Sequence, residues 1–288
     1  MFVRNSCYFF IYVAGGLFSQ FLYGNQGETW SSLEEEYTPN YCLQLEAAYG
    51  AGMMSEGGLE GIDYMFEALS LENKVALDIG SGIGGVAFYL AEKFSGQVTG
   101  LEVNAWMVAE SKNRIPEHLK DRVDFRLSTS NTGWLIPNDS YDIIYSKGVL
   151  THLETKDEIF QECYRLLKKG GLLVITDWLS SEDRRWGENI ARLVELENLA
   201  LFPESKAGYI ELLKKNGFTL LSVRDDSCVY HRFNQQIVER LQDVTQHQTL
   251  LNYFDETGLK ASIEGYKSIA KALEVEELKV FRFIVQKE

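Results

Sequence analysis

A glycine-rich segment, KVALDIGSGIGGVAFYL at residues 74–90, carries the most informative chemistry of this chain. Gly80, Gly82 and Gly84 have no side chains, so the backbone there can approach a bound ligand closely. Asp78 stands just before these glycines, and its carboxylate would repel a pyrophosphate seated on the N-terminus of the following helix. The segment therefore favours a ligand with a positively charged group, although the sequence GSGIGG also fits the motif that binds dinucleotides.

A second acidic residue, Glu102, ends the next apolar segment at residues 98–102. A carboxylate at the end of a second strand can accept hydrogen bonds from both hydroxyl groups of a ribose, which NAD and S-adenosylmethionine share. Glu102 therefore does not distinguish the two ligands. Asp78 does favour S-adenosylmethionine, because its amino and sulfonium groups are positive, and NAD stays the weaker alternative.

Apolar segments and helical patterns alternate through the middle of the chain. Strands are expected at residues 75–77, 98–101, 123–125, 143–145 and 172–175, with a turn at KKGG before the last of these, and helices at residues 86–94, 106–114 and 156–167. This alternation predicts an α/β fold with a parallel sheet covered on both faces. Ligands of such sheets bind beyond the carboxyl ends of the strands, where Asp78 and Glu102 would lie.

The flanking regions are predicted to be mostly helical. Residues 30–49 are expected to be a polar lead-in followed by a helix, residues 59–69 a second helix, and residues 220–223 and 280–286 two further strands. We expect residues 1–28 to be an apolar extension and residues 29–288 to be one domain. Helical lid segments are expected in this domain at about residues 182–216 and 230–276.

Charge and composition restrict the class of partner. The chain has 28 Lys and Arg against 42 Asp and Glu, a formal net charge of −14, which disfavours a nucleic-acid partner. Its four cysteines and four histidines are scattered, so neither a metal site nor a disulfide framework is predicted. Residues 1–26 resemble a signal peptide or weak membrane anchor, which leaves membrane proximity open. A cytoplasmic catalytic domain is nevertheless expected, because S-adenosylmethionine is supplied in the cytosol.

Four successive motifs, VALDIGSGIGG, VTGLEVN, YDIIYSKGVLTHL and LLKKGGLLVITDW, resemble those of class I S-adenosylmethionine-dependent methyltransferases. This resemblance implies a Rossmann-like, seven-stranded, mostly parallel sheet with an antiparallel last strand, N-terminal helices and a helical lid. It also implies S-adenosylmethionine as the cofactor. The residues expected to bind it are Ser55, Asp78, Gly80, Gly82, Gly84, Glu102, Val103, Ser130, Asn131 and Ser146. Ser130 stands where the family has an aspartate near the adenine amine.

A narrower resemblance covers YTPNYCLQLEAAYGAGMMSEGG, residues 37–58. It is similar to the segment before the first strand in phosphoethanolamine N-methyltransferases. This resemblance implies a helix and loop that close over the cofactor, with Tyr37 near the transferred methyl group. Ser55 would touch the carboxylate end of the cofactor.

The positions that bind substrate in that family depart from its pattern. Its Asp–His pair retains His152 but has Gly148 in place of the acid, and Trp178 replaces a tyrosine. The arginine expected to hold phosphate falls at about Glu197, and Glu36 replaces a glutamine. Phosphoethanolamine is therefore not expected to be the substrate. Trp178 and Glu36 would favour a cationic amine through cation–π and charge contacts.

The sequence thus predicts methyl transfer to a small molecule at an amine nitrogen. A protonated amine has no free lone pair, so the site must accept a proton or select the free base. His152 is the candidate base, with Tyr37 as its expected partner. Two alternatives stay open: O- or C-methylation of a lipid-like, quinone or sterol acceptor, and a non-catalytic protein that binds S-adenosylmethionine. The oligomeric state is not predicted.

Overall fold

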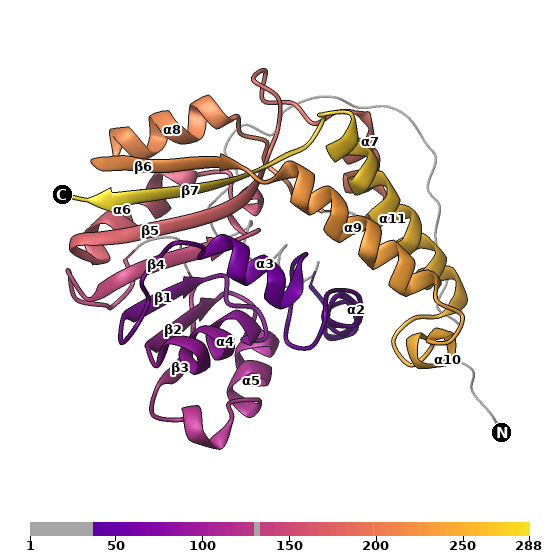
Figure 1. The fold of residues 1–288 in the computed structure, drawn as a ribbon, viewed down its shortest axis with the longest axis horizontal. Coiled ribbons are helices and arrows are strands. Elements are labelled where there is room, and N and C mark those ends of the chain that lie inside the picture. Colours follow the sequence, from indigo (N-terminus) through magenta and orange to yellow (C-terminus); the bar gives the residue numbers. More distant parts are fainter. Residues whose placement is uncertain (1–36, 130–132, 198) are drawn as a thin grey trace.

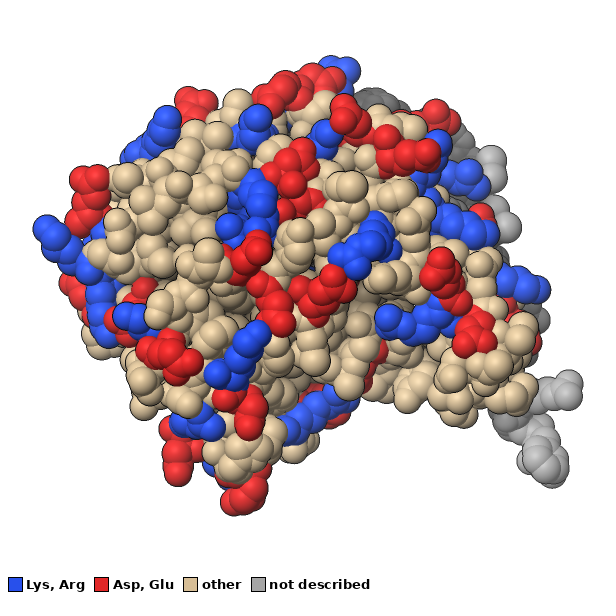
Figure 2. Space-filling model, viewed as in Figure 1, with Lys and Arg blue, Asp and Glu red and all other residues tan. Residues whose placement is uncertain are grey.

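The structure, a computed structural model, describes residues 37–129, 133–197 and 199–288. The predicted apolar extension, Glu36, Ser130 and Asn131 lie outside these ranges. Within them, no helix is both long and apolar enough to cross a membrane. Figure 2 shows one face of the molecule, where Lys and Arg side chains are interspersed with Asp and Glu.

Seven strands form one sheet in the order β3-β2-β1-β4-β5-β7-β6 (Figure 1). They are β1 Val75–Ile79, β2 Gln97–Glu102, β3 Val123–Leu127, β4 Tyr141–Lys147, β5 Leu167–Leu179, β6 Phe218–Asp225 and β7 Lys279–Lys287. Strands β1 to β5 pair in parallel, whereas β7 is antiparallel to both of its neighbours, β5 and β6. This arrangement confirms the predicted Rossmann-like sheet with an antiparallel last strand. The KKGG segment, expected as a turn, lies inside the long strand β5.

Helices cover both faces of the sheet because alternate strand residues point to opposite sides. The helices are α2 Pro39–Tyr49, α3 Gly58–Met65, α4 Gly85–Phe94, α5 Ala105–Asn113, α6 Lys156–Leu166, α7 Glu188–Glu197, α8 Lys206–Lys215, α9 Ser227–Gln242, α10 His247–Leu250 and α11 Glu256–Glu274, with short 3₁₀ turns at Glu117–Leu119 and Leu150–His152. Leu77 and Ile144 face the core under α6 and α8, while Ala76 and Ile143 face the core under α3, α4 and α5.

A separate helical layer lies beyond the carboxyl ends of the parallel strands (Figure 1). In it α9 and α11 lie side by side, and α7 packs against α11. Helix α8, which the sequence analysis assigned to the first lid segment, packs on the sheet instead. The ring of its Tyr209 stacks on Phe283 of β7, with centroids 5.1 Å apart. The helical layer over the site therefore consists of α7, α9, α10 and α11.

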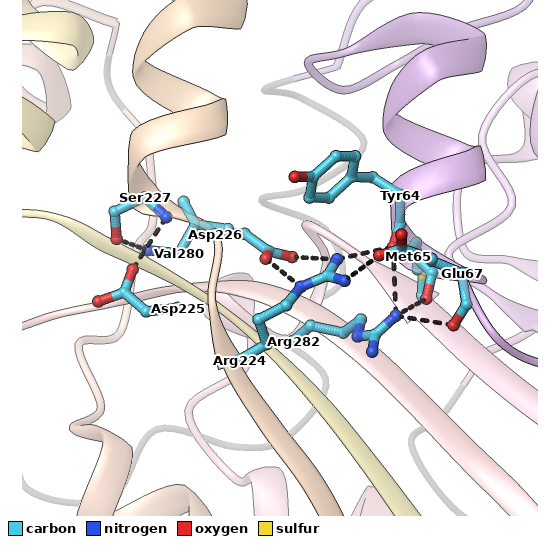
Figure 3. A network of polar contacts seen from close by, with 9 residues as sticks. All are labelled: Tyr64, Met65, Glu67, Arg224, Asp225, Asp226, Ser227, Val280 and Arg282. Carbon is cyan, nitrogen blue, oxygen red and sulfur yellow. Dashed lines mark hydrogen bonds and ion pairs between the residues drawn. The ribbon is translucent and has the colours of Figure 1, made fainter.

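Two arginines join this layer to α3 (Figure 3). Arg282 of β7 donates 3.2 Å hydrogen bonds to three carbonyl groups at the end of α3. Arg224 of β6 donates to the Tyr64 carbonyl at 2.7 Å and pairs with Glu67 and Asp226. Asp226 is the N-cap residue of α9. Because the carbonyl groups at a helix C-terminus lack intrahelical partners and attract cations, this joint fixes α3 against the start of α9.

Candidate active site

A pocket lies where β1, β2 and β4 end. Its walls include Asp78, Gly80, Gly82, Glu102 and Val103, all expected from the sequence to bind the cofactor. The strands are parallel and β1 lies between the other two, so their carboxyl ends meet at one edge of the sheet. The fold therefore brings the two acidic residues and the glycine loop together as the sequence predicted.

The glycine loop needs its glycines for two different reasons. Gly80 has a φ of +74°, and a Cβ atom there would lie 2.4 Å from the Val149 side chain. The Gly80 backbone therefore passes close to the loop after β4 at the pocket wall. Gly84 instead caps α4 and faces the ring of Phe125, 2.7 Å from where its Cβ would be. Gly84 serves core packing and does not line the pocket.

Asp78 is a buried acid that faces the pocket. It is 3% exposed, and its Oδ2 atom has no hydrogen-bond partner among the described residues. Burial raises the pKa of Asp78 to about 8, the neighbouring Tyr145 hydroxyl opposes this shift, and the Glu102 carboxylate adds to it. A buried carboxyl without a partner is costly, and a cationic ligand group would both pair with it and restore its charge.

The Glu102 carboxylate is held in one orientation by backbone groups. Its Oε2 accepts a hydrogen bond of 2.9 Å from the Gly82 amide, and its Oε1 accepts from the Val103 and Asn104 amides at 2.8 and 3.0 Å. Burial raises the pKa of Glu102, and these amide hydrogen bonds oppose the shift. A carboxylate fixed in this way can receive a pair of hydroxyl groups, as the ribose of S-adenosylmethionine would present.

A buried lysine in this pocket was missed by the sequence analysis. Lys147, the last residue of β4, donates hydrogen bonds of 2.7 Å to the Ser55 hydroxyl and to the Glu56 carbonyl. Burial lowers the pKa of Lys147 to about 8, and the Glu56 carboxylate acts in the opposite direction. Together with Asp78, Lys147 gives the pocket one acid and one cation, which complements the amino and carboxylate groups of an amino acid. The signal in the sequence was a lysine at the end of a buried strand.

Ser146, also expected to bind the cofactor, has another role. It is fully buried, and its hydroxyl donates a 3.3 Å hydrogen bond to the Ile79 carbonyl. Ser55, by contrast, lines the pocket and accepts from Lys147 as described above.

Helix α2 and the loop after it form a roof over this pocket. Asn104 donates a 2.9 Å hydrogen bond from its side chain to the Tyr37 carbonyl, just before α2. Glu46 of α2 accepts from the Gly52 amide at 2.7 Å and pairs with Arg114 at 2.6 Å. These bonds tie the roof to α5, in agreement with the closing helix and loop that the resemblance implied.

A second pocket adjoins the first one under the helical layer. The two share Tyr37, Met54, Ser55, Gly148 and His152. The remaining wall includes five aromatic side chains, which are Tyr41, Tyr49, Trp178, Phe254 and Tyr266. No Lys or Arg is found among the described residues that line this second pocket. Trp178 is therefore at the predicted site, whereas the side chains of Glu36 and Glu197 are outside the described set.

Tyr37 and His152 meet at the junction of the two pockets. The Tyr37 hydroxyl lies 3.2 Å from His152 Nε2, and the Ala200 carbonyl lies 3.2 Å from Nδ1. Burial lowers the pKa of His152 to about 4. The imidazole is therefore neutral near pH 7, with Nδ1–H donated to Ala200 and Nε2 left to accept from Tyr37.

The missing acid at Gly148 is compensated by a backbone group. We expected Tyr37 to orient the histidine, and the structure adds the Ala200 carbonyl on the opposite nitrogen. The segment that carries Ala200 is anchored by Lys156, whose ammonium donates to the Phe202 carbonyl at 3.0 Å. A carbonyl group gives no signal in the sequence, so this contact could not be foreseen.

Comparison with known proteins agrees with this geometry. Residues 77–175 match a family model described as a methyltransferase domain. The chain is 27% identical over 253 residues to phosphoethanolamine N-methyltransferase 1 of Arabidopsis thaliana, covering 88% of this chain and 50% of that protein. It is 29% identical over 200 residues to the phosphoethanolamine N-methyltransferase of Plasmodium falciparum, covering 68% of this chain and 73% of that protein.

The fold has a solved counterpart. The structure of Haemonchus contortus phosphoethanolamine N-methyltransferase 2, bound to phosphomonomethylethanolamine and S-adenosylhomocysteine, aligns with a TM-score of 0.81 and 22% identity, over 92% of this chain and 60% of that one. This chain spans about half the length of the Arabidopsis relative. The domain match supports the predicted cofactor, S-adenosylmethionine. Residues 77–175 are a methyltransferase domain, and the predicted resemblance of the chain to class I S-adenosylmethionine-dependent methyltransferases, and to phosphoethanolamine N-methyltransferases among them, is confirmed.

Proposed function

We propose that this chain transfers a methyl group from S-adenosylmethionine to the nitrogen of a small amine. The observation that carries the proposal is the junction at Tyr37 and His152, where the cofactor-type pocket meets an aromatic pocket. A donor in the first pocket and an acceptor in the second would meet at this junction.

The first pocket fits the cofactor by its charges. When bound, S-adenosylmethionine supplies an electrophilic methyl group on a sulfonium. Asp78 would hold its amino group, Lys147 and Ser55 its carboxylate, and Glu102 its ribose hydroxyls. The orphaned Oδ2 of Asp78 supports this assignment, because it lacks a partner within the described ranges.

In this proposal the rate enhancement comes from the positioning of the acceptor against the methyl group and from the exclusion of water. The Tyr37 hydroxyl donates to the neutral His152, so its oxygen can act as an acceptor for an N–H group of the methyl acceptor. That bond would orient the nitrogen lone pair toward the methyl group. With a pKa of about 4, His152 is a weak proton acceptor, which favours a mechanism that selects the free-base amine.

The second pocket supports an amine that carries no phosphate. Phosphate binding needs cations, and no Lys or Arg lines the described part of this wall. Leu193, Leu199 and Leu201 line it as well, and these apolar side chains favour the alternative of a lipid-like acceptor for O- or C-methylation. The buried Glu56 in the same wall opposes that alternative, because an apolar acceptor would leave its carboxyl without a partner.

The test measures release of S-adenosylhomocysteine from S-adenosylmethionine with a panel of acceptors. The panel contains ethanolamine, its mono- and dimethyl derivatives, dimethylglycine, phosphoethanolamine, a hydroquinone and a sterol. We expect methylation of amines without phosphate. Methylation of only the hydroquinone or the sterol would refute the amine proposal. Titration with S-adenosylhomocysteine and NAD tests the cofactor, and binding of S-adenosylhomocysteine without turnover of any acceptor would favour a non-catalytic binding protein.

A further inference from the structure

A buried acid that the proposed reaction does not yet use stands in the wall of the acceptor pocket. Glu56 lies in the loop two residues before α3 and is 4% exposed. Its Oε1 atom has no hydrogen-bond partner in the part of the chain that the structure describes. A carboxylate oxygen left unpaired in a protein interior costs free energy, so a ligand group that pairs with it would remove this cost.

The groups around Glu56 are also short of partners. The Tyr230 hydroxyl and Asn234 Oδ1, both on α9, lack hydrogen-bond partners within the described ranges. Trp178 and Asn234 lie close enough to the carboxylate to favour its charged form, although burial dominates and raises the pKa of Glu56. Lys147 bonds to the backbone carbonyl of Glu56 and to Ser55, and the side chains of Asn234 and Trp178 hydrogen-bond the carboxylate, which leaves its Oε1 atom without a partner in the described ranges. Unpaired hydrogen-bonding groups around an acid can together bind a ligand group that carries positive charge.

The side chains of the pocket wall also favour a positively charged ligand. The carboxylate shares its wall with the rings of Tyr49, Trp178 and Tyr266. Aromatic faces attract ammonium groups by cation–π interaction, and a buried carboxylate adds a direct charge interaction. An anionic group in the same place would be repelled.

We propose that Glu56 selects the acceptor by binding a positively charged ammonium group with its free carboxylate oxygen. The acceptor class is thereby narrowed to amines that bind as cations, and the N–H proton passes to the Glu56 carboxylate before the free amine attacks the methyl group. This inference rests on the proposed function, because it assigns the second pocket to the methyl acceptor. Glu56 was not among the residues expected from the sequence to form the site, whereas the neighbouring Ser55 was.

One competing role for Glu56 has to be separated from this one. The carboxylate also interacts electrostatically with Lys147, so it could serve only to balance that cation. In that case, removal of its charge would lower the pKa of Lys147 further and change the attraction of Lys147 for the carboxylate of the cofactor. Binding of S-adenosylhomocysteine would then change, and binding of an amine would not.

The experiment uses choline, whose quaternary nitrogen cannot accept a further methyl group, as a binding probe in the presence of saturating S-adenosylhomocysteine. Titration calorimetry is performed on the wild type, on Glu56→Gln and on Glu60→Gln. Glu60 is a matched control because it lies four residues away on α3, is exposed, and forms its ion pair within the described residues with Arg232 at the surface. Binding of S-adenosylhomocysteine by each variant verifies that the protein is folded.

We expect Glu56→Gln to weaken choline binding about tenfold or more, because the attraction between the quaternary ammonium and a buried carboxylate is lost, and to leave binding of S-adenosylhomocysteine within about twofold. Glu60→Gln should change neither. Choline should bind the wild type more tightly than phosphocholine, and Glu56→Gln should narrow this difference. If Glu56→Gln is unstable, Glu56→Asp is used. It should give an intermediate affinity, because the shorter side chain keeps the negative charge but places it farther from the ligand.

Several results would overturn the inference. They are absence of choline binding to the wild type, unchanged choline binding in Glu56→Gln, or an effect confined to S-adenosylhomocysteine. The acceptor panel tests the proposed function separately. Choline binding that depends on Glu56, without methylation of any amine, would refute the proposed function and keep the cation site. Amine methylation that is indifferent to Glu56 would do the reverse.

Discussion

The ionisation of Asp78 gives the sharpest test of the cofactor pocket. In the free protein burial raises the pKa of this carboxyl to about 8, so it is mostly protonated at pH 7. An ammonium group of the ligand favours the charged form, and the pKa in the complex should fall well below 7. Binding of S-adenosylhomocysteine near neutral pH should therefore release a proton from Asp78.

The expected size follows from this pKa. A group with a pKa of about 8 is roughly 1% ionised at pH 6 and half ionised at pH 8. If only the ionised form binds well, affinity should rise close to tenfold per pH unit from pH 6 to about pH 7.5. Lys147 has a pKa of about 8 and loses its charge above that pH, so affinity should level off and then fall.

The assay is titration calorimetry of S-adenosylhomocysteine between pH 6 and pH 9, in buffers of different ionisation enthalpy that count the protons released. The control is Asp78→Asn, which keeps the shape of the side chain and removes its ionisation. At pH 8 we expect it to bind at least about tenfold more weakly, because a charge-assisted hydrogen bond is lost, and to lack the rise below pH 7.5. A variant that keeps both the affinity and the pH slope of the wild type would refute the assignment of Asp78 to the amino group.

The remaining predictions concern the junction and the roof. Tyr37→Phe should lower kcat about a hundredfold and leave binding of S-adenosylhomocysteine nearly unchanged, because it removes only the hydroxyl that orients the acceptor; an equal loss of binding would contradict this role. Asn104→Ala should destabilise the protein by about 1 kcal/mol in thermal unfolding, since Asn104 caps α5, and should weaken cofactor binding. Asn104→Asp keeps the cap, but its carboxylate cannot donate to the Tyr37 carbonyl and would be buried beside Glu102, so both stability and binding should suffer. The pH profile of kcat/KM should follow the pKa of the acceptor amine, because His152, with a pKa of about 4, does not titrate near neutrality; an inflection between pH 6 and 7 that is common to all acceptors would count against this.

The cofactor pocket was largely predictable because its residues follow a local rule. Asp78 and Glu102 each stand at the end of an apolar segment, and parallel pairing of β1 with β2 places the two ends side by side. The same rule also assigned cofactor binding to residues that do not line the pocket. Gly84 and Ser146 belong to the same motifs, but one supports core packing and the other bonds to the Ile79 carbonyl. Membership of a motif does not say which way a residue points.

The contacts around the two pockets that join distant segments were less predictable. Lys147 reaches the loop at Ser55 and Glu56 only because β4 ends beneath that loop, 92 and 91 residues away along the chain. Arg282 likewise binds the end of α3 across more than 200 residues. The helical pattern of α8 was visible in the sequence, but amphipathic periodicity alone does not say whether a helix covers the sheet or the site.

Compared with the pattern of phosphoethanolamine N-methyltransferases, the negative charge of this site lies at a different position. Where the related pattern has an acid beside the histidine, this chain has Gly148, whose φ of +68° disfavours any side chain. His152 is oriented by a neutral carbonyl instead, so no carboxylate raises its basicity. The acid in this part of the site is Glu56, in the wall that faces the acceptor. In this site the carboxylate can hold a cation and does not raise the basicity of the histidine. This arrangement agrees with an acceptor that is bound as an ammonium group and methylated as the free amine.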